Sequence, residues 1–193
     1  MREAKWVFGY GSLIWRPDFE FIESQPADLG GYQRRFWQGS HDHRGVPEQP
    51  GRVVTLVPQA DTHCTGMAYL IEAEVVQHTF ERLDHREKNG YERVQTSLNL
   101  HDGRTVEGLV YIAPRNNFAY LGEAPLPEVA RQILHSVGPS GRNIDYLIEL
   151  ADALRELQAH DPHIFELESL VKAMQEQAGQ LENSRDSTRT IEE

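Results

Sequence analysis

Short runs of apolar and β-branched residues, bounded by Gly, Pro, Asn and Asp, fill most of the first 112 positions. Such runs are typical of β-strands. One stretch between them, residues 73–88, changes to helical spacing, with Val76, Phe80 and Leu83 on one face. The pattern therefore predicts one crossing helix and about six strands, at residues 5–10, 32–37, 53–57, 65–71, 91–100 and 105–112.

The rest of the chain has helical spacing. Pro127 suits the first turn of a helix that ends near Val137, and the Gly-Pro-Ser-Gly stretch at 138–141 breaks the pattern. A second helix is expected over residues 143–158. Asp161 is the expected N-cap of a third helix, with Pro162 at its first position.

Strands come first and helices last, with neither an internal repeat nor a linker between them. This order favours an α+β fold. We expect a single domain over residues 1–182, with a small, mixed, strongly curled or closed barrel-like sheet. Residues 183–193 lack apolar periodicity and are expected to form a frayed tail.

The net charge of the chain limits the classes of molecule that it can bind. Its formal net charge is −11, and residues 145–193 alone hold twelve acidic and four basic side chains. Such an excess repels a polyanion, so we expect no nucleic acid partner. The first 60 residues are balanced, and their arginines could still hold a small anion; they include Arg34, Arg35, Arg44 and Arg52.

Two further features favour a soluble protein of the cytoplasm. No apolar run approaches the ~18 residues that span a bilayer, and the polar start resembles no signal peptide, so we expect no membrane association. The single cysteine, Cys64, excludes an intramolecular disulfide, which favours a reducing compartment.

The first candidate site is the turn Gly9-Tyr10-Gly11-Ser12-Leu13, which directly follows the first strand. Two glycines there would let backbone N–H groups point into a cleft and hold an anion. The alternative is a tight turn that needs positive φ. A dinucleotide fingerprint is excluded because Ile14 stands where a third glycine is required, and the residues flanking Ser12 exclude a nucleophile elbow.

The second candidate is Glu87. It falls in the last turn of the helix expected at 73–88, where the helix dipole disfavours a negative charge. Partial burial would raise its pKa further, toward the range that suits a general base. The alternative is a solvated carboxylate between Arg86 and Lys88.

A third possibility is a metal site built from His41 and His43, with His63 and Cys64 as further ligands. Two histidines separated by one residue are a weak signal, because zinc needs three or four convergent ligands. A polar loop that bonds its own backbone is the favoured interpretation.

Taken together, seven blocks of the sequence resemble the ChaC family, whose members are glutathione-specific γ-glutamylcyclotransferases. The blocks, in order, are VFGYGSLIW at 7–15, RRFWQGS at 34–40, HRGVP at 43–47, PGRVVTL at 50–56, LDHREKNGY at 83–91, YLG at 120–122 and GPSGRN at 138–143. The resemblance spans about residues 6–172. One departure is Asn89, where relatives often carry Gly; Asn also tolerates the left-handed conformation.

The resemblance implies a small barrel-like α+β domain that converts glutathione to 5-oxoproline and cysteinylglycine, a lyase reaction of glutathione catabolism. It implies Glu87 as general base and acid, and a substrate site at Val7, Phe8, Gly9, Tyr10, Gly11 and Ser12. The nucleophile is the substrate's own α-amine, so no cofactor or metal is expected. Candidates for the cysteinylglycine half are Arg34, Arg44 and Tyr120.

Two alternatives stay open. The substrate could be another γ-glutamyl peptide or a γ-glutamylamine, because these share the glutamyl half of glutathione. The chain could also be a non-catalytic regulatory module, whose effect would survive replacement of Glu87 by glutamine.

Overall fold

The computed structural model describes residues 3–88 and 90–189. Its strands and helices are, in chain order, β1 (Lys5–Gly9), β2 (Glu23–Ser40), β3 (Gly51–Ile71), α1 (Val76–Arg86), β4 (Glu92–Leu100), β5 (Thr105–Ile112), α2 (Leu126–His135), β6 (Val137–Gly138), β7 (Gly141–Arg142), α3 (Asn143–Glu156) and α4 (Pro162–Arg189).

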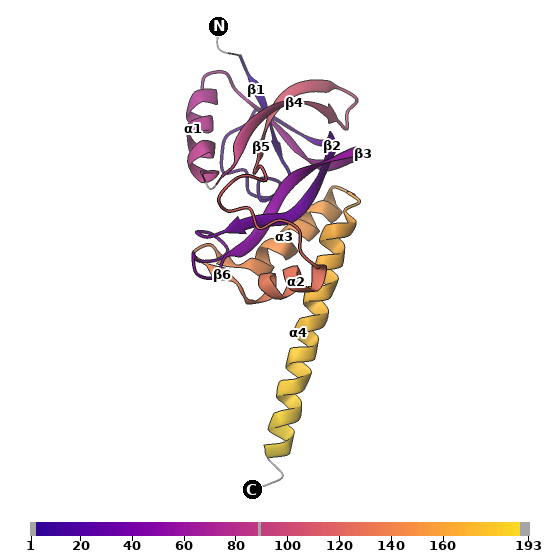
Figure 1. The fold of residues 1–193 in the computed structure, drawn as a ribbon. Coiled ribbons are helices and arrows are strands. Elements are labelled where there is room, and N and C mark those ends of the chain that lie inside the picture. Colours follow the sequence, from indigo (N-terminus) through magenta and orange to yellow (C-terminus); the bar gives the residue numbers. More distant parts are fainter. Residues whose placement is uncertain (1–2, 89, 190–193) are drawn as a thin grey trace.

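Five strands close into a barrel in the order β1-β3-β2-β4-β5, and β5 returns to pair with β1 (Figure 1). The β1–β5 pairing is parallel and the others are antiparallel, so the sheet is mixed. The sequence Asp102-Gly103, which is typical of a hairpin turn, joins β4 to β5, with Gly103 at φ 95°. The α+β fold with a closed barrel-like sheet is therefore confirmed.

The barrel has five strands and not about six, because the segments at 53–57 and 65–71 belong to one strand, β3. Pro58 does not end that strand. Tyr32 pairs with Pro58 while Gly30 pairs with His63, so the ladder between β2 and β3 is irregular where the proline stands. A residue without an N–H is tolerated at such a bulge. The strand predicted at 32–37 is likewise only part of β2.

The last three helices pack on one another and against the long ribbon of β2 and β3 (Figure 1). Asp161 caps α4, since its carboxylate accepts a hydrogen bond from the Ile164 N–H (3.3 Å), as predicted. α4 includes residues 183–189 of the segment for which the sequence predicts fraying, and residues 190–193 lie outside the described residues. Within the described residues, no helix is long and apolar enough to cross a membrane.

Alternate residues of β1 point into two different cores. Trp6 and Phe8 belong to the main core, which the barrel shares with α2, α3 and α4. Val7 belongs to a second core beneath α1, where it packs with Phe80 and Leu83. Because successive side chains of a strand point to opposite faces, this alternation decides which residues of the predicted turn and strand can reach a site inside the barrel.

Candidate active site

A cavity of about 320 Å³ lies where the turn after β1 meets the end of α1, the loop after β2 and the start of α3. This volume is at the lower end of the range for small-molecule sites. The cavity brings together Phe8, Tyr10, Gly11 and Ser12 with Glu87, which are far apart in the sequence.

Two of the predicted site residues, Val7 and Gly9, do not line this cavity. Val7 is fully buried beneath α1. At Gly9, an added Cβ would lie 2.6 Å from the Cβ of Leu13, so this glycine makes room for the turn to pack on the strand. Val7 and Gly9 therefore serve packing. They alternate along the chain with Phe8 and Tyr10, which do line the cavity.

The turn after β1 is a single helical turn. The Ile14 N–H donates to the Gly11 carbonyl (2.9 Å), and the Arg16 N–H donates to the Ser12 carbonyl (2.8 Å). Among the described residues, the N–H groups of Ser12 and Leu13 have no hydrogen-bond acceptor. These two donors are therefore available to an anion or a carbonyl oxygen in the cavity.

The glycines of this turn are not there for positive φ, because neither Gly9 nor Gly11 adopts it. At Gly11, an added Cβ would lie 2.8 Å from the Tyr146 hydroxyl and 3.0 Å from Val54. Close approach of the backbone to Tyr146 explains this glycine, and the interpretation as a turn that needs positive φ is wrong.

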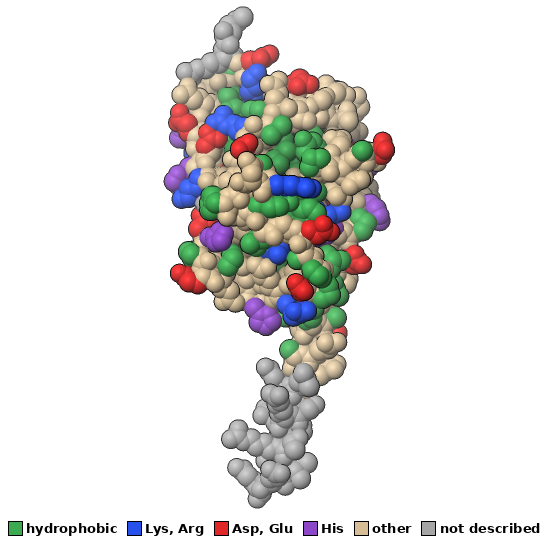
Figure 2. Space-filling model, viewed as in Figure 1, with side chains coloured by type: hydrophobic (Ala, Val, Ile, Leu, Met, Phe, Trp, Pro, Cys, Tyr) green, Lys and Arg blue, Asp and Glu red, His purple; other side chains and the backbone are tan. Residues whose placement is uncertain are grey.

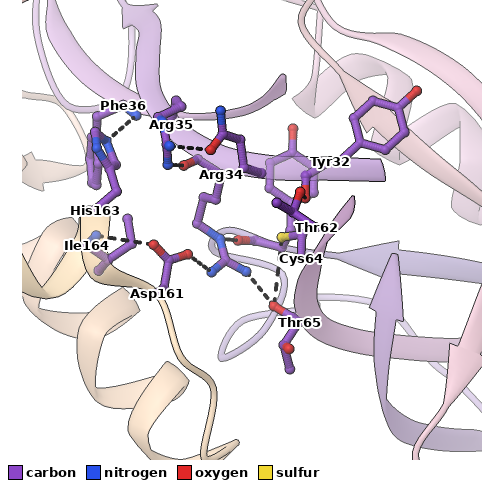
Figure 3. Close-up of polar contacts among 12 residues, drawn as sticks. Tyr32, Arg34, Arg35, Phe36, Thr62, Cys64, Thr65, Asp161, His163 and Ile164 are labelled. Atoms are coloured by element: carbon purple, nitrogen blue, oxygen red, sulfur yellow. Dashed lines mark hydrogen bonds and ion pairs between the residues drawn. The ribbon is translucent and has the colours of Figure 1, made fainter. Parts of the chain in front are cut away.

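Arg34 holds the turn through a backbone carbonyl, and Figure 3 shows its guanidinium directed at Thr65 and Asp161. Its guanidinium donates to the carbonyl oxygens of Tyr10 (2.6 Å) and Thr65 (2.5 Å) and forms an ion pair with Asp161 (2.7 Å). Its side chain is 1% exposed. Arg34 thus joins the turn, β3 and the start of α4, and it does not line the cavity.

Arg86 fixes the same turn from the side of α1. It donates to the Ser12 hydroxyl (2.8 Å) and to the Arg16 carbonyl (3.2 Å), and it forms an ion pair with Asp18 (3.3 Å). The end of α1 and the turn after β1 therefore hold each other in register, although they come from opposite sides of β2 and β3 in the sequence.

Glu87 follows α1 directly as its C-cap, and its N–H donates to the Leu83 carbonyl (2.8 Å). Its side chain is 19% exposed and lies 3.6 Å from the Arg86 Nε. Burial raises the pKa of Glu87 to about 7; Arg86 acts in the opposite direction, and Asp42 raises the pKa further. The predicted rise in the pKa of Glu87 is thus confirmed. The alternative, a solvated carboxylate between Arg86 and Lys88, is wrong because the Glu87 side chain is largely buried.

A glycine follows the end of α1. Gly90 has a φ of 92°, the left-handed conformation that closes a helix end. Asn89, the one departure from the family pattern, lies outside the described residues.

Four tyrosines line the cavity, and the sequence motifs give no reason to single them out as a group. Three of them donate hydrogen bonds within the protein: Tyr10 to the Tyr111 carbonyl (2.7 Å), Tyr91 to the Val54 carbonyl (2.9 Å) and Tyr111 to the Asp84 carboxylate (2.7 Å). The fourth, Tyr146, comes from α3. Burial raises its pKa to about 12, so its hydroxyl stays protonated at neutral pH.

The loop after β2 supplies charged groups to the cavity wall. The Arg44 guanidinium lies 5.7 Å from the centre of the Tyr146 ring and donates to the Arg142 carbonyl (3.0 Å). Asp42 also lines the cavity. Of the three residues considered for the cysteinylglycine half, only Arg44 reaches this cavity; Tyr120 forms an isolated bridge with Gln38.

Among residues 3–88 and 90–189, no three His, Cys, Asp or Glu side chains are grouped to hold a metal ion. His63 and Cys64 lie on β3 opposite Gly30 and Leu29, well along the ribbon from the loop that holds His41 and His43. The metal interpretation therefore receives no support. What the site offers is a carboxyl group that titrates near neutral pH beside free N–H donors, an arrangement suited to moving a proton on a bound amine.

Comparison with known proteins gives a consistent result. The family model described as ChaC-like protein matches residues 5–174. The γ-glutamylcyclotransferase 2-3 of Arabidopsis thaliana is 41% identical over 187 residues, covering 93% of this chain and 94% of the relative. The human glutathione-specific γ-glutamylcyclotransferase 1 is 40% identical over 178 residues, covering 89% of this chain and 80% of the relative.

A solved structure agrees with the sequence comparison. The crystal structure of a γ-glutamyl cyclotransferase from yeast, described as specific to glutathione, matches with a TM-score of 0.84 at 31% identity. The match covers 88% of this chain and 96% of the yeast chain.

Proposed function

We propose that this chain, which belongs to the ChaC-like protein family, is a γ-glutamylcyclotransferase that acts on glutathione. The observation that carries the proposal is Glu87, a largely buried carboxyl group with a pKa of about 7, in one cavity with the free N–H donors of the turn after β1. The proposal is supported by relatives of about 40% identity and by a similar yeast structure, all of which are named as γ-glutamylcyclotransferases.

In the proposed reaction, Glu87 first removes a proton from the substrate's α-ammonium group. An ammonium group has no lone pair and cannot attack a carbonyl. A carboxylate whose pKa is close to ambient pH is a good acceptor for this proton, because it is ionised often enough and still basic enough. Burial gives Glu87 that pKa, and Arg86 at 3.6 Å keeps it from rising further.

The free α-amine then attacks the γ-carbonyl carbon of the same glutamyl residue and closes a five-membered ring. The cavity must hold the flexible glutamyl chain folded, and such ordering is worth ~7–11 kcal/mol in well-oriented intramolecular reactions. We assign the substrate's α-carboxylate to the N–H groups of Ser12 and Leu13. Arg34 and Arg86 keep these donors in place through Tyr10 and Ser12.

In the last step, the bond from the γ-carbon to the cysteine nitrogen breaks and the protonated Glu87 returns its proton to that nitrogen. The products are 5-oxoproline and cysteinylglycine, and Glu87 is ionised again. No protein nucleophile is required. Cys64 agrees with this, since it does not line the cavity and burial raises the pKa of its thiol to about 11.

In this arrangement, the cysteinylglycine half of the bound glutathione extends toward the loop after β2. We assign its glycine carboxylate to Arg44, which lines the cavity. Within the part of the chain that the structure describes, its one ion pair is with the half-exposed Glu149 at 3.4 Å, so the guanidinium retains attraction for a second carboxylate.

The test is incubation of the purified protein with glutathione, without added metal or nucleotide. We expect release of 5-oxoproline and cysteinylglycine in equal amounts. Parallel assays with γ-glutamyl-alanine and a γ-glutamylamine test specificity, and equal turnover of all three would reject glutathione as the preferred substrate. Absence of 5-oxoproline from every assay would favour the non-catalytic module.

We further propose that the enzyme works in the cytoplasm, as a single domain over residues 1–182 that binds no nucleic acid. The net charge of −11 supports the last point. On the face drawn in Figure 2, acidic and basic side chains are interspersed, where a nucleic-acid surface would gather basic groups. Electrophoresis with labelled DNA and RNA at low salt tests this, and we expect no shift.

A further inference from the structure

The hydroxyl group of Tyr146 differs from those of the other tyrosines around the cavity. Tyr10, Tyr91 and Tyr111 each donate their hydroxyl proton to an oxygen of the protein. Tyr146 is only 6% exposed, and its hydroxyl oxygen accepts a hydrogen bond from the Val54 N–H; among the described residues, no acceptor is found for its own proton. A phenolic hydroxyl can accept and donate at the same time, so this proton is available to a ligand in the cavity.

The ring of Tyr146 is held on several sides. Trp15 and Phe36 meet it edge to face, with ring centres at 5.5 and 5.9 Å, and Arg44 lies over its face. Its hydroxyl is against the turn after β1, because a Cβ added at Gly11 would come within 2.8 Å of it. The hydroxyl is thus fixed in place against the turn after β1 at Gly11.

We propose that the Tyr146 hydroxyl is a catalytic hydrogen-bond donor to the γ-carbonyl oxygen of the substrate, and that it stabilises the negative charge this oxygen gains when the α-amine attacks. The inference rests on the proposed function and adds a residue to it. A preorganised donor of this kind acts mainly on the transition state, because the oxygen is most negative there.

The choice of the γ-carbonyl oxygen over the α-carboxylate follows from charge. Tyr146 is close enough to Glu87 for the carboxylate to raise the pKa of the phenol. A substrate carboxylate at Tyr146 would therefore lie near the ionised base and be repelled by it. The γ-carbonyl is neutral when the substrate binds, and it must approach the amine that Glu87 deprotonates, so it suits this position better.

The test is Tyr146→Phe, which removes the hydroxyl and keeps the ring that Trp15 and Phe36 contact. We expect kcat for glutathione to fall ~10²-fold, as on the loss of one oxyanion donor, with KM within about twofold of its original value. The dependence of kcat/KM on pH should keep the limb set by Glu87. The melting temperature should drop by a few degrees at most, because the Val54 N–H loses its partner.

Tyr91→Phe is the matched variant, since it also removes one buried phenolic hydroxyl from the cavity wall. That change leaves the Val54 carbonyl without its partner, so the melting temperature should drop by a few degrees. Each variant removes one hydrogen bond to the Val54 backbone, so a large fall in kcat in Tyr146→Phe alone would separate a catalytic hydroxyl from a structural one.

Three results would overturn the inference: an unchanged kcat in Tyr146→Phe, a raised KM at unchanged kcat, or an equal fall in kcat in Tyr91→Phe. Failure of the proposed function has a different signature, because the unmodified protein would then release no 5-oxoproline at all.

Discussion

Replacement of Glu87 by glutamine should make the protein more stable and inactive at the same time. The cause is burial, which raises the pKa of this carboxyl group to about 7 from an ordinary value of 4.5. Glutamine keeps the shape of the side chain and cannot ionise, so it avoids the cost of a charge in a largely buried place.

The size of the effect depends on pH. Below about pH 4.5, Glu87 is protonated in both the folded and the unfolded chain, so its pKa does not affect stability. Between pH 4.5 and 7 the unfolded chain loses the proton and the folded chain keeps it, so the free energy of unfolding falls as pH rises. Above pH 7 the cost is constant at about 3 kcal/mol, taking 1.36 kcal/mol for each pH unit between the two pKa values.

Urea unfolding followed by tryptophan fluorescence at pH 5 and pH 8 measures this. The stability of Glu87→Gln minus that of the original protein should grow from under 1 kcal/mol at pH 5 toward about 3 kcal/mol at pH 8. Release of 5-oxoproline should fall ~10²–10⁴-fold. Glu81→Gln, at an exposed position of α1, is the control and should change neither quantity. An equal stability change at both pH values, or near-normal turnover, would refute the assignment of Glu87 as a buried base.

Three further predictions follow from the same geometry. The kcat/KM for glutathione should rise about tenfold from pH 6 to pH 8, because kcat/KM follows the ionisation of Glu87 in the free enzyme; Asp42→Asn should shift the midpoint to lower pH, because Asp42 raises the pKa of Glu87, and a profile that is flat over this range would contradict both. Arg34→Met should lower the free energy of unfolding by about 3–5 kcal/mol, measured with urea, because it leaves the Asp161 carboxylate unpaired; a loss under 1 kcal/mol would mean that the buried ion pair contributes little. Cys64→Ala should keep kcat within about twofold, and a folded but inactive variant would argue against a mechanism without a thiol.

The sequence alone determined those features that depend on neighbours along the chain. The change from alternating to helical spacing predicted the barrel strands and the helix that ends beside Glu87, and the position of Glu87 at that end predicted the direction of its pKa. Asp161 and the Asp-Gly turn were equally predictable, because capping and turn geometry involve only a few adjacent residues.

The tertiary structure decided what depends on contacts between distant segments. It made one strand of the two runs around Pro58, because β2 pairs with β3 on both sides of the irregular stretch. It placed Val7 and Gly9 away from the cavity. Only the packing of α1 shows which face of β1 lies beneath the helix and which face reaches the cavity. It also left Tyr146 as the cavity tyrosine without an acceptor among the described residues. Periodicity along a chain indicates that a side chain is buried, but its contacts there depend on how the elements pack. In this protein, those contacts set the pKa of Glu87 and determine which tyrosine hydroxyl can donate to a ligand.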